Sequence, residues 1–334
     1  MSLPPSGEIP QGAIRFNTDS QRLEFYAQGE WWIMSTDTPN LAQSGDSTPG
    51  ARGIIGARAT PGLIDEIDYF TIATRGNATV FGEMSTARYL YGTLASSTRG
   101  VFTGGNGQLS RIESITFAST GDAVVDAGTL STGRYLTIGC SNSIRGLTAG
   151  GTPYINNIDS TIIASLGNAE DFGDLVEAIR QPGAYASPVR GIFAGGYGPS
   201  SAIKNTLQFV TISTTGNTQD FGDLVTTSTN PKGTGSATRA VWGNTSTPSA
   251  STRIDFITMA STGNAQVFGD LITSLSTGGS FSSVTRGVYA GGLPGNSATC
   301  ESVEISTAGN AVDFGDLSTG GHGGIGMSNG HGGL

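Results

Sequence analysis

Histidine, cysteine and lysine are scarce in this chain of 334 residues, which has 2 His, 2 Cys and almost no Lys. The triplet Asp171-Phe172-Gly173 looks like the magnesium-holding element of a protein kinase, but a kinase also needs a histidine-containing catalytic loop. Both histidines, His322 and His331, lie at the far end of the chain, which excludes that loop. Cys140 and Cys300 occupy different offsets in different repeats, so a disulfide framework is excluded as well.

Charge and long apolar runs are also lacking. Only 13% of residues are charged and the net charge is -9, so there is no basic stripe to bind nucleic acid. The sequence has no run of 18 apolar residues, so no membrane span is predicted. The start, MSLPPSGEIP, has neither a basic nor an apolar region of a signal peptide, so synthesis without a signal peptide is expected.

A repeat of about 47 residues dominates the rest of the chain. Gly 52 is about twice average usage, and the glycines recur at fixed offsets between β-branched runs, which favours an ordered all-β fold. Six copies start at an arginine followed by a small residue and an apolar run: Arg52, Arg99, Arg145, Arg190, Arg239 and Arg286. A Gly-Asn or Gly-Asp pair gives the same period at Gly76, Gly121, Gly167, Gly216, Gly263 and Gly309.

Each copy divides into four short runs: a small, glycine-rich run, the arginine run, an alternating run and a short Asp-Phe-Gly-Asp-Leu run. Alternation at period two is typical of a strand with one buried face, and four antiparallel strands in 47 residues are typical of a propeller blade. We expect the Gly-Asn pair to form a tight hairpin turn between the third and fourth strands.

A closed ring is favoured over an open solenoid, because a solenoid needs capping units. The repeat begins at its second strand, Arg52, and residues 322–334 match the missing first strand. The sequence therefore predicts an all-β, six-bladed β-propeller over residues 52–334, closed by the C-terminal strand. We expect one phenylalanine per copy to pack between blades: Phe81, Phe172, Phe221, Phe268 and Phe314. The neighbouring Asp174, Asp223, Asp270 and Asp316 are expected to cap turn amides.

Residues 1–51 lie outside the repeat. Residues 12–34 read as a small β-hairpin with more apolar surface than a hairpin buries alone, so residues 1–40 are predicted to be a docking arm. Residues 41–51, rich in Ser, Thr, Pro and Gly, are predicted to be a linker. The predicted docking residues of the arm are Phe16, Leu23, Phe25, Tyr26, Trp31 and Trp32.

Two resemblances suggest a function. The unit resembles a kelch-type repeat, and its wording around Arg-Gly-Val-Phe-Ala-Gly-Gly and Gly-Asn-Ala-x-Asp-Phe-Gly-Asp-Leu looks like repeats of virion proteins of tailed bacteriophages, including those of cyanobacteria. The segment GAIRFNTDSQRLEFYAQGEWW is similar to one in phage tail-fibre proteins. Together they imply a virion surface protein, a homo-oligomer whose arm binds other virion proteins and whose ring binds host protein or polysaccharide.

No catalytic, cofactor or metal residue is predicted, because the histidines sit together in the closing strand and the arginines recur in every copy. Variable loops between the second and third strands are the expected recognition surface. The candidate residues there are Tyr154, Asn156, Tyr197 and Asn244. The predicted function is a non-enzymatic tail fibre or other tail or neck appendage. A capsid decoration protein and a propeller enzyme, such as a glycan hydrolase or lyase, remain alternatives.

Overall fold

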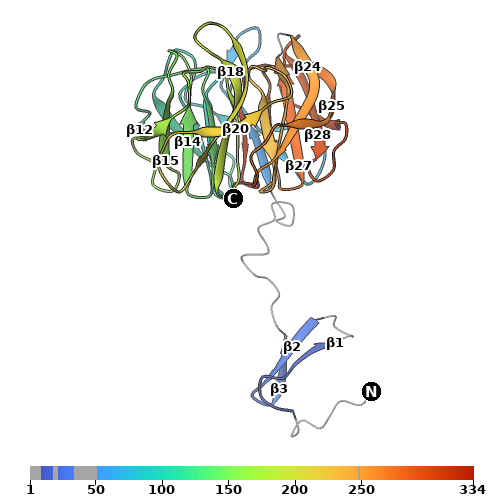
Figure 1. Cartoon of the computed structure of the whole chain (residues 1–334). Coiled ribbons are helices and arrows are strands. Elements are labelled where there is room, and N and C mark those ends of the chain that lie inside the picture. Colours follow the sequence, from blue (N-terminus) through green and yellow to red (C-terminus); the bar gives the residue numbers. More distant parts are fainter. Residues whose placement is uncertain (1–8, 18–21, 34–50, 247–248) are drawn as a thin grey trace. The chain divides into compact units, whose positions relative to one another are not determined.

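The computed structural model of the chain describes residues 9–17, 22–33, 51–246 and 249–334 (Figure 1). These ranges contain strands and no helix, so none holds a helix long and apolar enough to cross a membrane. The chain divides into two compact units, Met1–Gln43 and Ser44–Leu334. The predicted linker, residues 41–51, lies outside the described residues except for Ala51.

The first unit is a three-stranded antiparallel sheet rather than the two-stranded hairpin expected from the sequence. Its strands are β1 (Ile14–Asn17), β2 (Arg22–Ala27) and β3 (Glu30–Ile33). The two tryptophans lie in β3, which pairs with β2 through Phe25 opposite Trp32 and Tyr26 opposite Trp31. Because β1 and β3 pair with the two edges of β2, the sheet has three strands, which makes so small a sheet more stable than a two-stranded hairpin.

The described residues of the second unit form six antiparallel sheets of four or five strands, one for each repeat, and one two-stranded sheet. Sheet 1 contains β30 (Gly326–Ser328), β4 (Arg52–Ile55), β7 (Glu66–Thr71) and β8 (Thr79–Glu83). Sheet 2 contains β9 (Gly92–Ala95), β10 (Arg99–Thr103), β11 (Arg111–Thr116) and β12 (Val124–Thr129). Sheet 3 contains β13 (Ile138–Ser141), β14 (Arg145–Ala149), β15 (Asn157–Ile162) and β16 (Glu170–Asp174).

The other three sheets repeat this arrangement. Sheet 4 contains β17 (Gly183–Ala186), β18 (Arg190–Tyr197), β19 (Ile203–Thr211) and β20 (Gln219–Asp223). Sheet 5 contains β21 (Lys232–Gly235), β22 (Arg239–Gly243), β23 (Thr245–Ser246), β24 (Ala250–Thr258) and β25 (Gln266–Leu275). Sheet 6 contains β26 (Gly279–Ser282), β27 (Arg286–Gly292), β28 (Ser297–Glu304) and β29 (Val312–Asp316).

Strands from the two ends of the second unit meet in sheet 1. The C-terminal strand β30 pairs with β4, with Met327 opposite Ile54, and a separate two-stranded sheet joins β5 (Arg58–Ala59) to β6 (Leu63–Ile64). The innermost strands touch in succession, β9 with β13, then β17, β21, β26 and β30, and β30 touches β9. The second unit is therefore an all-β, propeller-like assembly of antiparallel sheets.

A β-bulge explains the repeated Phe-Gly pair. In sheet 4, Leu207 pairs with Gly222 and Gln208 with Asp220, so Phe221 is the extra residue of the outer strand. A bulge turns its extra side chain out of the ladder. The five bulged phenylalanines are 1–3% exposed. Phe221, for example, lies in a cluster with Leu207 of its own sheet and Met259 of sheet 5.

The Gly-Asn pair docks on the outer strand of the preceding sheet, and does not form the tight hairpin turn expected from the sequence. The connection from β19 to β20 is long, and within it Asn217 accepts a hydrogen bond through Oδ1 from the backbone N–H of Asp174, at 3.0 Å. All six copies make this contact at 3.0–3.2 Å, including Asn77 with Asp316. The backbone N–H groups of the four aspartates are thus capped themselves. No backbone N–H in the described part of the chain donates to their carboxylates, so the turn capping predicted for these side chains is not found there.

The bulge glycine makes this approach possible. A Cβ atom on Gly222 would lie 2.5 Å from the carbonyl oxygen of Gly263, and one on Gly315 would lie 2.3 Å from that of Gly76. Both glycines also have positive φ, at 142° and 145°. Only glycine meets both requirements without strain. We call each of these interfaces between consecutive sheets a seam.

The repeated arginines cross the same seams. Each donates from Nη1 to a carbonyl at the end of the third strand of the next sheet, at 2.7–3.0 Å. Arg190, for example, reaches Met259 and stacks its guanidinium 4.9 Å from the ring centre of Phe209. Arg286 of sheet 6 reaches Ile72 of sheet 1 in the same way. The six arginines are thus structural links between sheets.

A buried polar residue on each third strand completes the seam. These residues accept from the backbone N–H that follows the outer strand of the preceding sheet, and they are Asp68, Glu113, Asp159, Gln208, Asp255 and Glu301. In sheets 1, 2 and 3 the carboxylate also pairs with a buried arginine, as Arg134 does with Asp159 at 2.8 Å. In sheet 4 the corresponding residues are Ile179 and Gln208, so the charged pair is replaced by an uncharged one.

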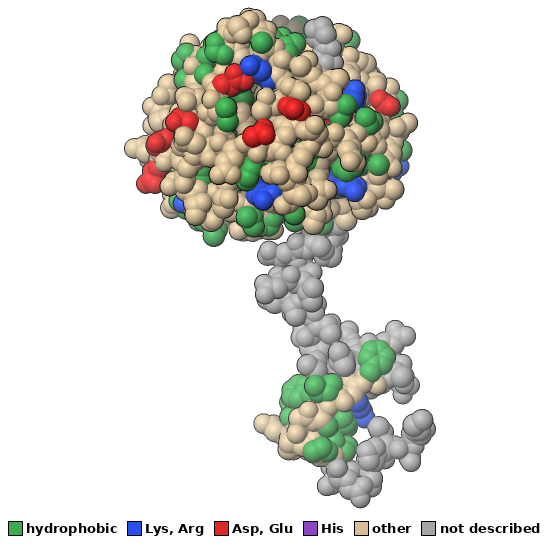
Figure 2. Space-filling model, in the orientation of Figure 1, with side chains coloured by type: hydrophobic (Ala, Val, Ile, Leu, Met, Phe, Trp, Pro, Cys, Tyr) green, Lys and Arg blue, Asp and Glu red, His purple; other side chains and the backbone are tan. Residues whose placement is uncertain are grey.

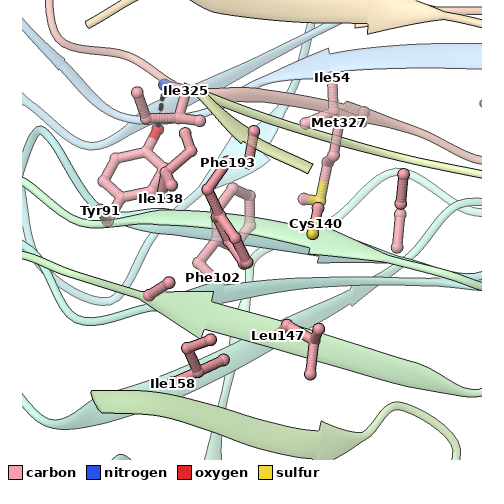
Figure 3. Packing of buried hydrophobic residues seen from close by; sticks show 14 of the residues in the cluster. Ile54, Tyr91, Phe102, Ile138, Cys140, Leu147, Ile158, Phe193, Ile325 and Met327 are labelled. Carbon is pink, nitrogen blue, oxygen red and sulfur yellow. Dashed lines mark hydrogen bonds between the residues drawn. The ribbon is translucent and has the colours of Figure 1, made fainter. Parts of the chain in front are cut away.

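The apolar core is distributed between the sheets. Figure 3 shows one cluster that combines Ile54 and Met327 of sheet 1, Phe102 of sheet 2, and Ile138 and Leu147 of sheet 3. Tyr91 ties this cluster together, because its hydroxyl donates to Ala57 O at 2.9 Å and accepts from the N–H of Ile325 at 3.2 Å. Stability therefore depends on contacts between sheets as much as on pairing within them.

Replacing Phe221 by Ala should remove the bulged side chain from one seam. We expect a loss of about 3–5 kcal/mol in the free energy of unfolding, since a fully buried aromatic leaves a cavity. Chemical denaturation of the full chain measures it. Val225→Ala, at a 40% exposed side chain two residues past the same strand, is the control and should change stability little. A loss below about 1 kcal/mol for Phe221→Ala would contradict the packing role.

Candidate functional site: an apolar sheet face, a rim and an axial cavity

The small N-terminal sheet has one largely apolar face. Alternation along the strands places Ile14, Phe16, Phe25 and Trp32 on the same side. Phe16 is 59% exposed and Trp32 is 49% exposed. Figure 2 shows hydrophobic side chains gathered on this sheet. Leu23 belongs to β2, but its side chain lies outside the described residues.

Two of the predicted docking residues lie on the opposite face. Tyr26 is only 4% exposed, and its ring lies 5.3 Å from that of Trp31. Arg15 stacks 4.1 Å from the ring centre of Trp31 and pairs with Glu24 at 2.7 Å. Tyr26 and Trp31 therefore do not share a face with Phe16 and Trp32, because successive residues of a strand point to opposite faces. The docking role of the six residues stays a prediction. Tyr26 and Trp31 belong to the more buried face of the sheet, together with Arg15 and Glu24.

The predicted recognition loops contain one buried residue. Asn244 is only 2% exposed, and both ends of its amide are bonded, Nδ2 to Gly291 O and Oδ1 to the N–H of Gly278, each at 3.0 Å. Its assignment to a recognition surface is wrong, because it joins sheet 5 to sheet 6. Tyr154 and Tyr197 are partly exposed and Asn156 is exposed, so these three remain available at the surface.

Backbone hydrogen bonds link the segments that precede the first strands, in a ring with one gap, at one end of the innermost strands. We call this end the mouth. The ring is formed by residues between the outer strand of one repeat and the first strand of the next, most of them with positive φ, such as Leu90 (55°) and Leu136 (58°). Five bonds of 2.6–2.9 Å link Leu90, Leu136, Gln181 and Asn230 in succession, and Thr277 to Gly323 and back to Leu90. We call this ring the girdle. The girdle fixes the backbone at these positions and so orients the side chain of the residue just before each of them.

Those preceding side chains form a rim around the mouth. The rim includes Tyr89, Tyr135, Arg180 and His322, all partly exposed. The guanidinium of Arg180 lies between two loop tyrosines, 5.0 Å from the ring centre of Tyr154 and 5.4 Å from that of Tyr197. Its Nε is buried and has no hydrogen-bond partner. The rim therefore presents a cation and two aromatic rings together, a combination suited to anionic or sugar-like groups.

His322 is held in place by two neighbouring side chains. Its Nδ1 lies 2.7 Å from Oδ1 of Asn296, and its ring packs edge-on to Tyr89 at 6.2 Å. Burial lowers its pKa. Sequence reasoning missed Tyr89, Tyr135, Arg180 and His322 as one group. The signal was present in the short segments that precede each first strand, such as Arg134-Tyr135-Leu136.

The innermost strands enclose a cavity of about 70 Å³ on the axis. Its lining includes backbone and small side chains of all six sheets, together with Cys140, Tyr185, Lys232 and His331. The first strands are thus less uniformly small than the sequence suggests, since Tyr185, Lys232 and Phe281 belong to them. Burial raises the pKa of Cys140 to about 12, which makes this thiol a poor nucleophile.

His331, near the C-terminus of the chain, is one of the residues that line this cavity. Its Nδ1 accepts from the N–H of Gly333 at 3.1 Å, so Nε2 carries the proton and donates to Ala95 O at 3.1 Å. Burial lowers its pKa to about 4, and the hydrogen bond to Ala95 opposes that shift. In Figure 1 the C-terminus lies at the end of the unit opposite the β18–β19 connection. The neutral ring therefore fastens the tail after β30.

Within residues 9–17, 22–33, 51–246 and 249–334, no cluster of three His, Cys, Asp or Glu side chains is suited to holding a metal ion. Cys140 and Cys300 are both buried free thiols. The groups that the structure does bring together are hydrogen-bond donors and aromatic rings.

Comparison with known proteins supports the fold alone. No protein-family model matches the chain, and no curated protein matches it. Among solved structures, the chain is similar to "Structure of YjhT", with a TM-score of 0.62 and 8% sequence identity. The alignment covers 73% of this chain and 88% of that one. At this identity the similarity extends to the propeller-like arrangement and not to the function.

Stability should fall in acid partly through His331. Its pKa is about 4 in the folded chain and near 6.5 when unfolded, so only the unfolded chain gains this proton between those values. The folded state should thus lose up to about 3 kcal/mol as the pH falls from 6.5 to 4. His331→Gln retains an amide donor toward Ala95 and should be less sensitive to acid over this window. Unfolding at pH 7.5 and at pH 4.5 checks it, and parallel pH profiles for the two proteins would contradict the role given to His331.

Proposed function

We propose that the chain is a non-enzymatic structural protein of a tailed-phage particle, most simply a tail fibre or another tail or neck appendage exposed on the virion. The N-terminal sheet would attach it to other virion proteins, and the second unit would contact the host surface. The observation that carries the proposal is the exposed apolar face of a sheet that forms its own compact unit. Such a face is suited to a protein partner.

We propose further that the second unit is a six-bladed propeller closed by its C-terminal strand. The pairing of β30 with β4 supports this. So do three bonds between sheets 6 and 1 that match those at every other seam: Arg286 to Ile72 O, Asp316 N–H to Asn77, and Ser318 N–H to Asp68. A closed ring needs no partner to cover its edges. The N-terminal sheet is then free to serve assembly.

The rim is the part of the ring best suited to recognition. Arg180 between Tyr154 and Tyr197 offers a cation held by two aromatic rings, with Asn156 exposed in the same connection as Tyr154. Protein or polysaccharide at a host surface would meet side chains of this kind. Over the face drawn in Figure 2, the second unit shows scattered charges and no large hydrophobic patch. This favours transient, polar contact for the ring and lasting, apolar contact for the N-terminal sheet.

The two alternatives make different demands. A glycan hydrolase or lyase needs a pair of carboxylates or another acid–base pair in a cleft, whereas buried carboxylates such as Asp159 and Glu301 accept backbone hydrogen bonds at the seams. A capsid decoration protein would use the same apolar face with a different partner. The position of the protein on the particle therefore distinguishes a capsid decoration protein from the proposed tail or neck appendage.

Replacing Phe16 and Trp32 together by Ser should abolish incorporation into particles and leave the ring intact. Both side chains are exposed, so the melting temperature of the second unit should not change. The measurements are calorimetry of the full chain and quantification of the protein in purified particles. Val124→Ser with Val125→Ser, two exposed side chains of β12, is the matched control and should incorporate normally. Normal incorporation of the Phe16 and Trp32 variant would refute the docking role.

A further inference from the structure

Lys232 is a buried cation without a counter-ion. Its side chain is 2% exposed at the start of β21. The only other lysine of the chain, Lys204, pairs with Glu177 at 2.9 Å. No carboxylate of the described residues forms an ion pair with Lys232 within 4.0 Å. The buried acids of sheets 5 and 6 have other partners, since Asp255 pairs with Arg253 at 2.9 Å and Glu301 accepts from the N–H of Ile272.

The hydrogen bonds of Lys232 are also incomplete. Its Nζ donates to Oδ1 of Asn230 at 2.7 Å, and an ammonium group can donate three bonds. Nδ2 of Asn230 is buried as well and has no acceptor. Both unsatisfied groups are donors, and they belong to side chains already joined by a hydrogen bond. The missing partner must therefore be an acceptor, and the uncompensated charge favours a negative one.

The surroundings leave room for such a partner. Lys232 and Gly233 line the axial cavity of about 70 Å³, which exceeds the space needed by one water molecule. The girdle is interrupted beside them, because within the described residues Thr277 N–H does not bond Asn230 O as the other five links do. The side chain of Asn244 enters that gap and takes the N–H of Gly278 instead. Lys232 thus lines the cavity and joins it, through the hydrogen bond from Nζ to Asn230, to the gap at the seam between sheets 5 and 6.

We propose that Lys232 and Asn230 hold a small inorganic anion, of the size of a halide ion, in the axial cavity. Without an anion, burial lowers the pKa of Lys232 to about 7, so the ammonium form is costly at neutral pH. A bound anion would keep the lysine charged and satisfy the amide of Asn230 at the same time. The anion would act as a structural ion between sheets 5 and 6.

The test is the halide dependence of thermal unfolding of the full chain. At pH 6 and constant ionic strength, replacing gluconate by chloride or bromide should raise the melting temperature with the logarithm of halide concentration. Above the dissociation constant, each tenfold increase should add roughly 2–4 °C. Lys232→Met should remove this dependence, whereas Lys204→Met, which alters the other lysine, should keep it.

Asn230→Asp offers a second variant that retains Lys232. It places a carboxylate beside Nζ, and Asp tolerates the positive φ of 56° found there. Its melting temperature should no longer depend on halide. If Lys232→Met fails to fold, an anomalous-scattering peak from bromide against Nζ in crystals of the unaltered protein supports the proposal. A melting temperature independent of halide, an equal dependence in Lys232→Met, or a bromide-free cavity filled by water would each overturn it.

Discussion

The second unit depends on one close contact, repeated at every seam: the Gly-Asn or Gly-Asp pair of one sheet lies directly on the bulge glycine of the sheet before it. The contact brings a carbonyl oxygen within 1.9–2.5 Å of where a Cβ would stand, so only glycine fits the bulge. The same bulge turns a phenylalanine into the space between sheets, and the Asn side chain caps the next N–H. One short motif thereby provides packing, spacing and a polar link. Its recurrence in the sequence reflects this geometry.

Much of this could be predicted from the sequence, because the relevant signals are local and periodic. Strand positions follow from alternation, and the role of Phe221 or Arg190 follows from its place in every copy. The Gly-Asn pair was misread as a tight turn because its partner lies in the preceding repeat, roughly 40 residues away. Asn244 was misassigned for a similar reason. Its environment is set by Gly278 and Gly291 of the next sheet, which no local pattern reveals.

The site was less predictable than the fold. Phe16 and Trp32 share an exposed face, but the division of the arm's aromatic residues between two faces depends on a third strand and its register. The rim is built from single residues of several repeats, each inconspicuous by itself. Lys232 stands where other copies carry glycine or isoleucine, at Gly183 and Ile138 for example. Such a departure from the repeat is a sequence signal for a binding site. The cavity and the unbonded amide of Asn230, which only the structure reveals, point to the kind of ligand.

The central claim is that the seam between sheets 6 and 1 is equivalent to the internal seams, so that the unit is a closed ring. Comparing Gly315→Ala at that seam with Gly222→Ala at an internal one tests this directly, with Gly62→Ala, where a Cβ meets nothing within 4 Å, as the baseline. The account predicts equal losses in the free energy of unfolding, each about 1–3 kcal/mol. A loss for Gly315→Ala no larger than that for Gly62→Ala, with a full loss for Gly222→Ala, would show that the ring is open there.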